Sequence, residues 1–164
     1  MLIPRLRRLA RHDDLEVVHG IYMHDEVVPY LGQDPMPLDD FRPVFEGLLA
    51  TDSFFVALRD EEVRGFYRVN RQKGRSQHVA ILETLAISPS AKGTGFAQAM
   101  IAEALECMHE EGIRRVELMV EADNPRAFAF YRKLGFEQEG RLRAAYKRAN
   151  QPDYVDELLM ARLL

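Results

Sequence analysis

The sequence predicts a single mixed α/β domain, and three observations support this. Its 164 residues fall within the roughly 100–200 that one domain usually takes. Apolar stretches typical of strands are interspersed with stretches whose apolar residues recur at helical spacing. No internal repeat, low-complexity tract or Gly/Ser-rich linker marks a boundary. We therefore expect one domain over residues 1–164.

The composition disfavours several classes of protein. Apolar residues make up 47% and charged residues 29%, which is ordinary for a globular chain. The 22 basic and 26 acidic residues give a net charge of −4, which disfavours nucleic-acid binding. A single cysteine, Cys107, rules out an internal disulfide framework, and the histidines lack metal-ligand spacing. No apolar run reaches the roughly 18 residues of a membrane span, and the basic start at Met1–Arg11 lacks a signal-peptide core. A cytoplasmic protein without a metal is expected.

Four segments carry the signals of helices. A capping residue, Asp13 or Asp14, precedes the first one, and a proline-rich irregular segment follows it. In the last segment, Asn124 is suited to the N-cap and Pro125 to the first helical position. The helices are expected from about 14 to 22, 39 to 49, 96 to 111 and 124 to 134.

Seven segments have the features of strands. Residues 78–87 are almost continuously apolar, as in a central strand covered on both faces. Residues 53–59 and 63–70 predict an antiparallel hairpin, although the link Asp60-Glu61-Glu62 lacks the Asn-Gly signal of a two-residue turn. The strands are expected at residues 6–9, 53–59, 63–70, 78–87, 115–121, 136–147 and 154–163.

The loop at residues 88–97 connects an apolar strand to a helix. The first turn of a helix has unpaired N–H groups and the positive end of the helix dipole. Gly93 and Gly95 allow the backbone to approach a bulky anion, Lys92 adds a charge, and the small Ala97 leaves room. These features predict a pyrophosphate site, although glycines before a helix more often form a plain turn. The spacing fits neither a P-loop nor a dinucleotide-binding fingerprint.

Two segments together resemble the GCN5-related N-acetyltransferase (GNAT) family, and the resemblance runs from about Leu6 to the end. Residues 87–97, Ile-Ser-Pro-Ser-Ala-Lys-Gly-Thr-Gly-Phe-Ala, are similar to motif A of that family. Residues 124–136, Asn-Pro-Arg-Ala-Phe-Ala-Phe-Tyr-Arg-Lys-Leu-Gly-Phe, are similar to motif B. Their order and spacing are also those of the family. The closing segments 140–148 and 154–162 resemble a bacterial subgroup that includes L-amino-acid N-acetyltransferases.

The resemblance implies a fold and a donor. The fold is a central, mostly antiparallel twisted sheet with one parallel, splayed strand pair and about four flanking helices. The donor is acetyl-CoA. Lys92 stands where the family usually has Arg or Gln, which keeps the charge but loses bidentate geometry. The implied contacts are the backbone of Leu85, Ala86 and Ile87 for the pantetheine arm, the loop Lys92, Gly93, Thr94, Gly95, Phe96 and Ala97 for the pyrophosphate, and Asn124 for the arm or a water beside it.

Acetyl transfer to an amine needs a group that takes the ammonium proton and an acid that protonates the leaving thiolate. The resemblance places Tyr131 at the sulfur of coenzyme A as the acid, and the alternative is a core aromatic. Glu83, the one charge in its apolar strand, is the expected base because partial desolvation makes a carboxylate more basic. The alternatives are a glutamate facing solvent at a bulge or one paired with an arginine such as Arg68. Glu121 and His78 are further candidates.

We therefore expect an enzyme that moves the acetyl group of acetyl-CoA to the primary amine of a small molecule. The α-amine of an L-amino acid is the preferred acceptor, and transfer is direct within a ternary complex. Polyamines, antibiotics and protein N-termini are rival acceptors, and a non-catalytic CoA-binding sensor is the alternative from another class. The terminal strand is apolar and predicts pairing with a second copy as a homodimer, through Leu158, Leu159, Met160, Leu163 and Leu164.

Overall fold

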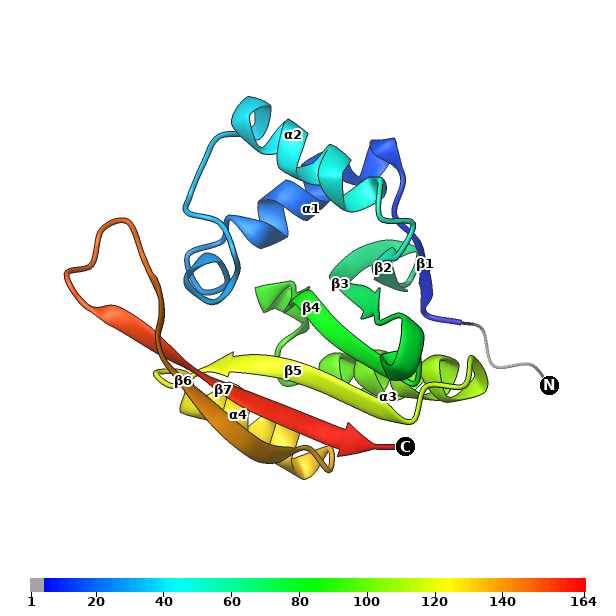
Figure 1. Ribbon diagram of the computed structural model, residues 1–164. Coiled ribbons are helices and arrows are strands. Elements are labelled where there is room, and N and C mark those ends of the chain that lie inside the picture. Colours follow the sequence, from blue (N-terminus) through cyan, green and yellow to red (C-terminus); the bar gives the residue numbers. More distant parts are fainter. Residues whose placement is uncertain (1–4) are drawn as a thin grey trace. The chain divides into compact units, whose positions relative to one another are not determined.

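The computed structural model describes residues 5–164, which form a mixed sheet with flanking helices (Figure 1). The strands are β1 (Arg7–Leu9), β2 (Phe54–Arg59), β3 (Glu62–Arg71), β4 (Val79–Ile87), β5 (Arg115–Glu121), β6 (Glu137–Lys147) and β7 (Tyr154–Leu163). The α-helices are α1 (Leu15–Tyr22), α2 (Leu38–Leu49), α3 (Phe96–Glu110) and α4 (Pro125–Lys133). Every predicted strand and helix is present, with small shifts at the ends. Met1–Pro4, which begin the basic segment considered above, lie outside the described residues.

The seven strands form one sheet in the order β1-β2-β3-β4-β5-β7-β6. The pair β4–β5 is parallel, whereas β1–β2, β2–β3, β5–β7 and β6–β7 are antiparallel. This confirms the predicted fold class, a mostly antiparallel sheet with one parallel pair.

The chain divides into two compact units, and it crosses between them more than once. The first unit contains the residues up to Val69 together with Thr84–Cys107. The second contains Asn70–Glu83 and Met108–Leu164. Whether residues 1–164 act as one domain stays a prediction.

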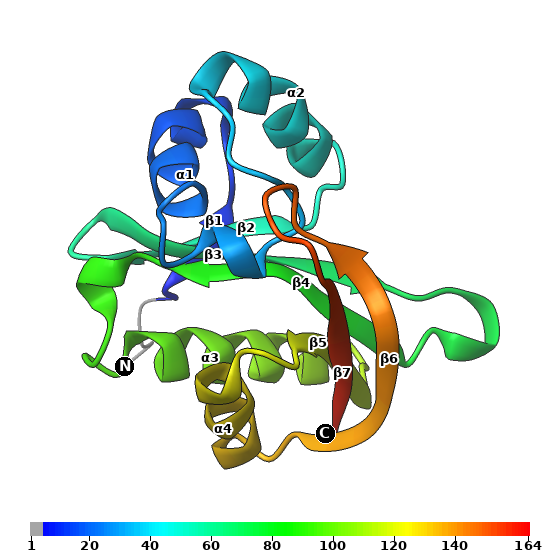
Figure 2. The same cartoon turned by 90° about the vertical axis from the view of Figure 1, so that its left-hand side faces the viewer.

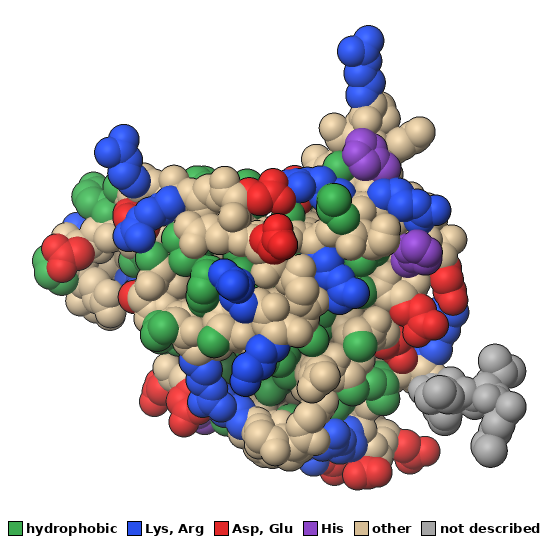
Figure 3. Space-filling model, turned by 90° about the horizontal axis from the view of Figure 1, so that it is seen from below, with side chains coloured by type: hydrophobic (Ala, Val, Ile, Leu, Met, Phe, Trp, Pro, Cys, Tyr) green, Lys and Arg blue, Asp and Glu red, His purple; other side chains and the backbone are tan. Residues whose placement is uncertain are grey.

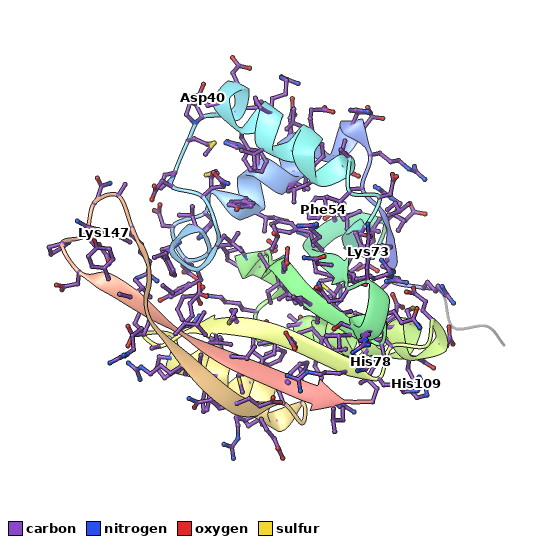
Figure 4. The ribbon with its side chains drawn as sticks, viewed as in Figure 1. Asp40, Phe54, Lys73, His78, His109 and Lys147 are labelled. Carbon is purple, nitrogen blue, oxygen red and sulfur yellow. The ribbon has the colours of Figure 1, made fainter. Side chains whose placement is uncertain are left out.

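Aromatic side chains form the core of the first unit, in which α1 and α2 cover one face of β1–β3 and α3 lies on the other (Figure 2). Phe66 of β3 stacks on Tyr22 of α1 with ring centroids 6.0 Å apart, and it meets Phe54 of β2 at 5.6 Å. Phe54, which is labelled in Figure 4, meets Phe45 of α2 edge-on with ring centroids 6.3 Å apart. All four rings are buried. Burial of this much apolar surface holds the two helices on the strands.

Asp14 has a different role from the predicted helix cap. Its buried carboxylate accepts two hydrogen bonds from the Arg8 guanidinium, at 2.7 and 2.8 Å, and one from the backbone N–H of Arg11 at 2.7 Å. Burial raises the pKa of Asp14, but these donors outweigh it and hold the pKa below its usual range. Asp14 occupies the N-cap position of α1 without bonding to its amides. It ties α1 to β1 instead.

In the second unit, β7 lies between β5 and β6, and the three strands run side by side (Figure 2). The pairing of β5 with β7 places Glu121 directly opposite Glu157. Arg162 of β7 donates a hydrogen bond of 2.8 Å to the carbonyl group of Leu134, just after α4. The strand order therefore brings the end of β5 close to residues that follow it by more than 30 positions in the sequence.

Charges of both signs are interspersed on the face shown in Figure 3, consistent with the small net charge of −4. Within residues 5–164, no helix is long and apolar enough to cross a membrane. The same part of the chain contains no group of three or more His, Cys, Asp or Glu side chains that could hold a metal ion.

The turn between β2 and β3 is a two-residue turn without glycine. Arg59 pairs with Glu62, so only Asp60 and Glu61 lie in the loop, and their φ angles are +52° and +64°. Two positive φ angles are the geometry of a type I′ turn, which favours Asn-Gly. The sequence did not reveal the turn type because L-residues rarely adopt this conformation.

We expect the double substitution Asp60→Asn, Glu61→Gly to raise the free energy of unfolding by about 1 kcal/mol, because it relieves part of this backbone strain. Urea unfolding should show a higher midpoint with an unchanged m-value. An unchanged or lower midpoint would contradict the prediction.

Candidate functional site

Strand β4 changes its backbone geometry near its middle. Its parallel pairing with β5 covers Val79–Ile81 against Arg115–Glu117, although β4 continues to Ile87. Thr84 has a φ of +47°, a left-handed conformation that is rare for a β-branched residue. Such a residue interrupts the alternation of side chains along a strand. The irregularity immediately precedes residues 85–87, to which the resemblance assigns the pantetheine arm.

The loop before α3 has an open, glycine-dependent backbone. Gly93 and Gly95 have φ angles of +70° and +81°, and a Cβ atom built at either position would meet nothing within 4 Å. The Thr94 hydroxyl group donates to the carbonyl group of Ala91 at 2.5 Å, which fixes the turn. Helix α3 begins at Phe96 directly after it. An open backbone that leads into the unpaired first turn of a long helix suits an anion such as pyrophosphate.

Lys92, the predicted cation of this loop, already has a partner. Its ammonium group pairs with the Glu26 carboxylate, and both side chains are partly exposed. An anion at the loop would compete with Glu26 for Lys92. Since the pair is exposed, such competition would cost little.

Glu83, the predicted base, has a hydrogen-bond donor in the second unit. The Asn70 side-chain amide donates to its Oε1 at 2.8 Å, and Glu83 is half-buried. The sequence suggested Arg68 as an alternative partner of Glu83, and that pairing stays a prediction beside the hydrogen bond from Asn70.

Glu121 at the end of β5 is a half-buried carboxylate with a strongly perturbed pKa. Burial raises the pKa of Glu121 to about 7, and the carboxylates of Glu157 and Asp123 add to the increase. Its own backbone N–H and the charge of Arg148 act in the opposite direction. A carboxylate with a pKa near neutrality can both accept and release a proton at working pH.

Tyr131 lies in α4, and its side chain is 91% buried. Its ring meets Phe130 and Phe136 edge-on at centroid distances of 5.3 and 5.8 Å. Within residues 5–164, its hydroxyl group has no hydrogen-bond partner. Burial and then the negative charge of Glu121 raise the pKa of Tyr131 above its usual value, so the phenol stays protonated at neutral pH.

A cluster that the sequence did not reveal interacts electrostatically with Glu121. Arg148, which follows β6, donates to both carboxylate oxygens of Asp123 at 2.6 and 3.2 Å and to the Tyr146 hydroxyl group at 3.0 Å. Burial and the charge of Glu121 raise the pKa of Tyr146 to about 12. The bidentate pair joins the turn after β5 to the end of β6. No local pattern could have identified it, because its members are separated by 25 residues.

Asn124 is confirmed as the N-cap of α4. Its Oδ1 accepts a hydrogen bond from the backbone N–H of Ala127 at 3.2 Å. The side-chain oxygen is therefore engaged, and a contact with the pantetheine arm, which stays a prediction, would fall to its NH₂ group.

Two other residues, His78 and Cys107, were considered from the sequence. His78 is exposed just before β4 (Figure 4), and Cys107 is buried in α3. Neither shows a feature of a catalytic group.

The family model described as the acetyltransferase (GNAT) family matches residues 16–136. The L-amino acid N-acetyltransferase AaaT of Escherichia coli is 32% identical over 165 residues, which cover 95% of this chain and 96% of the relative. The mycothiol acetyltransferase of Brachybacterium faecium is 40% identical over 91 residues, which cover 55% of this chain but only 28% of that protein. The chain thus matches less than a third of that longer relative.

The fold has solved counterparts. The spermidine N-acetyltransferase of Vibrio cholerae, crystallised with CoA and spermine, has a TM-score of 0.80 and 22% identity, with 96% of this chain and 94% of that chain covered. This similarity concerns the fold. From the family match and the nearly full-length similarity to AaaT, the chain belongs to the acetyltransferase (GNAT) family, whose members are acyltransferases that use acetyl-CoA.

Proposed function

We propose that this protein transfers the acetyl group of acetyl-CoA to the primary amine of a small molecule, with the α-amine of an L-amino acid as the preferred acceptor. The observation that carries the proposal is the similarity to an L-amino acid N-acetyltransferase over 95% of the chain. The open glycine loop before α3 and the buried, protonated Tyr131 support the same chemistry.

In this proposal the chain's backbone holds the donor. The N–H groups from Gly93 to Ala97 bind the pyrophosphate, and Lys92 adds a cation at the rim. The positive φ angles of Gly93 and Gly95, and the open space beside them, fit such a group. The backbone of residues 85–87 binds the pantetheine arm by strand-like hydrogen bonds, with Asn124 contacting the arm or a water beside it.

Bound acetyl-CoA supplies an activated acyl group, and the protein moves protons around it. The amine nitrogen forms a bond to the acyl carbon as the carbon–sulfur bond breaks. Tyr131 gives its proton to the leaving thiolate and regains one from the nitrogen. A carboxylate takes the first proton from the ammonium form of the acceptor, and Glu83 is the carboxylate that the sequence predicts for this role.

Acceptor-dependent thiol release from acetyl-CoA tests the function. A panel of L-amino acids, including L-phenylalanine and L-methionine, is compared with their α-N-blocked forms, spermidine, an aminoglycoside and short peptides. We expect release with free amino acids and none with the blocked forms. Thiol release only with spermidine, the aminoglycoside or the peptides would contradict the amino-acid acceptor and identify the class that gives release as the acceptor.

A CoA-binding sensor is the alternative from another class, and binding alone does not separate it from an enzyme. Acetyl-CoA at a hundred times its dissociation constant should stabilise either protein by about 2.7 kcal/mol. Stabilisation without thiol release for any amine would indicate the sensor. A cytoplasmic location and a homodimer stay predictions. The predicted strand pairing of the C-terminal apolar residues with a second copy is wrong, because β7 already lies between β5 and β6. Light scattering at working concentration measures the oligomeric state.

A further inference from the structure

We propose that Glu121 is the group that takes the proton from the ammonium form of the acceptor. The assignment rests on the proposed function and deepens it by naming a catalytic residue on β5. It also describes the chemistry of the acceptor site, in which the ammonium group of the acceptor would lie beside carboxylates.

The first support is that Glu121 is half-buried and not neutralised by direct contact. Across residues 5–164, no other residue donates a hydrogen bond to its carboxylate or forms an ion pair with it. A partly buried carboxylate is normally paired, because desolvation of an unpaired charge is costly. An ammonium group would supply the missing partner, whereas Glu83 already accepts a hydrogen bond from Asn70.

The second support is the charge of the groups around Glu121, which come from several elements. Glu157 lies opposite on β7, and Asp123 follows β5 in the chain. Arg148 is the cation that acts on Glu121, but its guanidinium makes a bidentate bond to Asp123. The carboxylates that act on Glu121 outnumber this cation, which favours an ammonium group beside Glu121. Burial is the main cause of the raised pKa of Glu121, and the charges of Glu157 and Asp123 add to the increase.

The third support is the neighbouring Tyr131. Its pKa responds to the charge of Glu121, and its hydroxyl group lacks a hydrogen-bond partner in the described part of the chain. Tyr131, a proton donor, and Glu121, a proton acceptor, therefore both have shifted pKa values, and the charge of Glu121 acts on Tyr131 within the second unit. Pairs of titratable groups whose environments push their pKa values apart are typical of catalytic acids and bases.

The proton balance is simple. Glu121, ionised, takes one proton from the ammonium group, and the neutral amine attacks the acyl carbon. The second proton lost by the nitrogen replaces the one that Tyr131 gave to the thiolate. Glu121 then releases its proton to water, so that one proton leaves the protein in each turnover.

The pH dependence of kcat/KM provides the main test. Because Glu121 must be ionised, kcat/KM in the wild type should rise through an apparent pKa near 7. Glu121→Gln should lower kcat/KM at pH 8 by about 100-fold and remove this limb. Glu137→Gln, the same change at an exposed position of β6, is the matched control. It should keep the wild-type kcat/KM at pH 8 and the rise of kcat/KM near pH 7. An acidic limb and activity that persist in Glu121→Gln would overturn the assignment.

Glu157→Gln shows whether the pH dependence of kcat/KM comes from Glu121 or from the titration of the acceptor amine. Removing the facing carboxylate should shift the limb to lower pH by about 0.5 unit, whereas the pKa of the free amine cannot change. Carbon-13 titration of glutamate carboxyl groups gives a readout that needs no turnover. One signal should titrate near pH 7 and be absent from Glu121→Gln.

The outcomes distinguish the two proposals. The role of Glu121 is contradicted if no carboxyl signal titrates near pH 7, or if the acidic limb of the kcat/KM profile does not move in Glu157→Gln. Either outcome leaves the proposed transferase function unaffected. A wild-type protein that releases no thiol with any amine contradicts the proposed function itself, and the role of Glu121 with it.

Discussion

Tyr131→Phe is expected to lower kcat by at least about 100-fold, since loss of a positioned acid typically costs 10²–10⁴-fold. The substitution removes one oxygen atom from a buried ring and leaves the edge-on contacts with Phe130 and Phe136 in place. The hydroxyl group has no hydrogen-bond partner within residues 5–164, so no bond is lost on folding. Stability should therefore stay the same or increase slightly. The measurement is kcat and the unfolding midpoint on the same preparation.

Tyr154→Phe is the matched control for this variant. Tyr154 is 66% exposed in the same unit, so the loss of its hydroxyl group should change neither quantity. If Tyr131→Phe keeps its kcat, Tyr131 is a core aromatic and the thiolate is protonated by another group.

Gly65→Ala is expected to have the largest effect on stability, a loss of about 2 kcal/mol. A Cβ atom at this position of β3 would lie 2.9 Å from the carbonyl oxygen of Ala86, 3.0 Å from Sδ of Met100 and 3.2 Å from Cγ2 of Ile87. The shortest of these contacts is to backbone, which cannot move aside as a flexible side chain does. Urea unfolding measures the loss.

The same substitution should raise KM for acetyl-CoA. Ala86 and Ile87, which a new Cβ atom would displace, belong to the segment that we propose for the pantetheine arm. Gly47→Ala is the control in the first unit, because it is a helical glycine of α2 with nothing within 4 Å. It should raise stability by about 0.5–1 kcal/mol and leave KM unchanged. Equal stability of Gly65→Ala and the wild type would show that β3 and β4 separate more easily than their contacts suggest.

The elements of the fold were predictable where a local signal decides the conformation. Asn124 and Pro125 mark the beginning of α4 because capping and a fixed proline φ act within one turn. Asp14 was mistaken for a working helix cap because its Arg8 partner lies outside the helix pattern. The two-residue turn at Asp60 and Glu61 was missed because its sequence lacks the residues that normally indicate it.

The site was less predictable, because its properties depend on groups brought together by the sheet. The open backbone of the loop before α3 follows from Gly93 and Gly95, whereas its role as a pyrophosphate site stays a prediction. The environment of Glu121 could not, since it depends on Glu157 across the β5–β7 pair and on Arg148 beyond β6. Sequence reasoning chose Glu83 because it is the one charge in an apolar strand, and one of its hydrogen-bond donors, Asn70, also comes from another strand.

The place of β7 between β5 and β6 has a consequence for protein synthesis. The ribosome completes β5 at Glu121 and β6 at Lys147, but neither can form its ladder with β7 until Tyr154–Leu163 have been made. During that interval both strands are unpaired on the sides that β7 will occupy, and such edges are prone to non-native pairing. Helices α1 and α2 and the β2–β3 hairpin have no such wait, because their partners are close in the chain. In the nascent protein, the N-terminal aromatic core should therefore form well before β5, the strand that carries Glu121, pairs with β7.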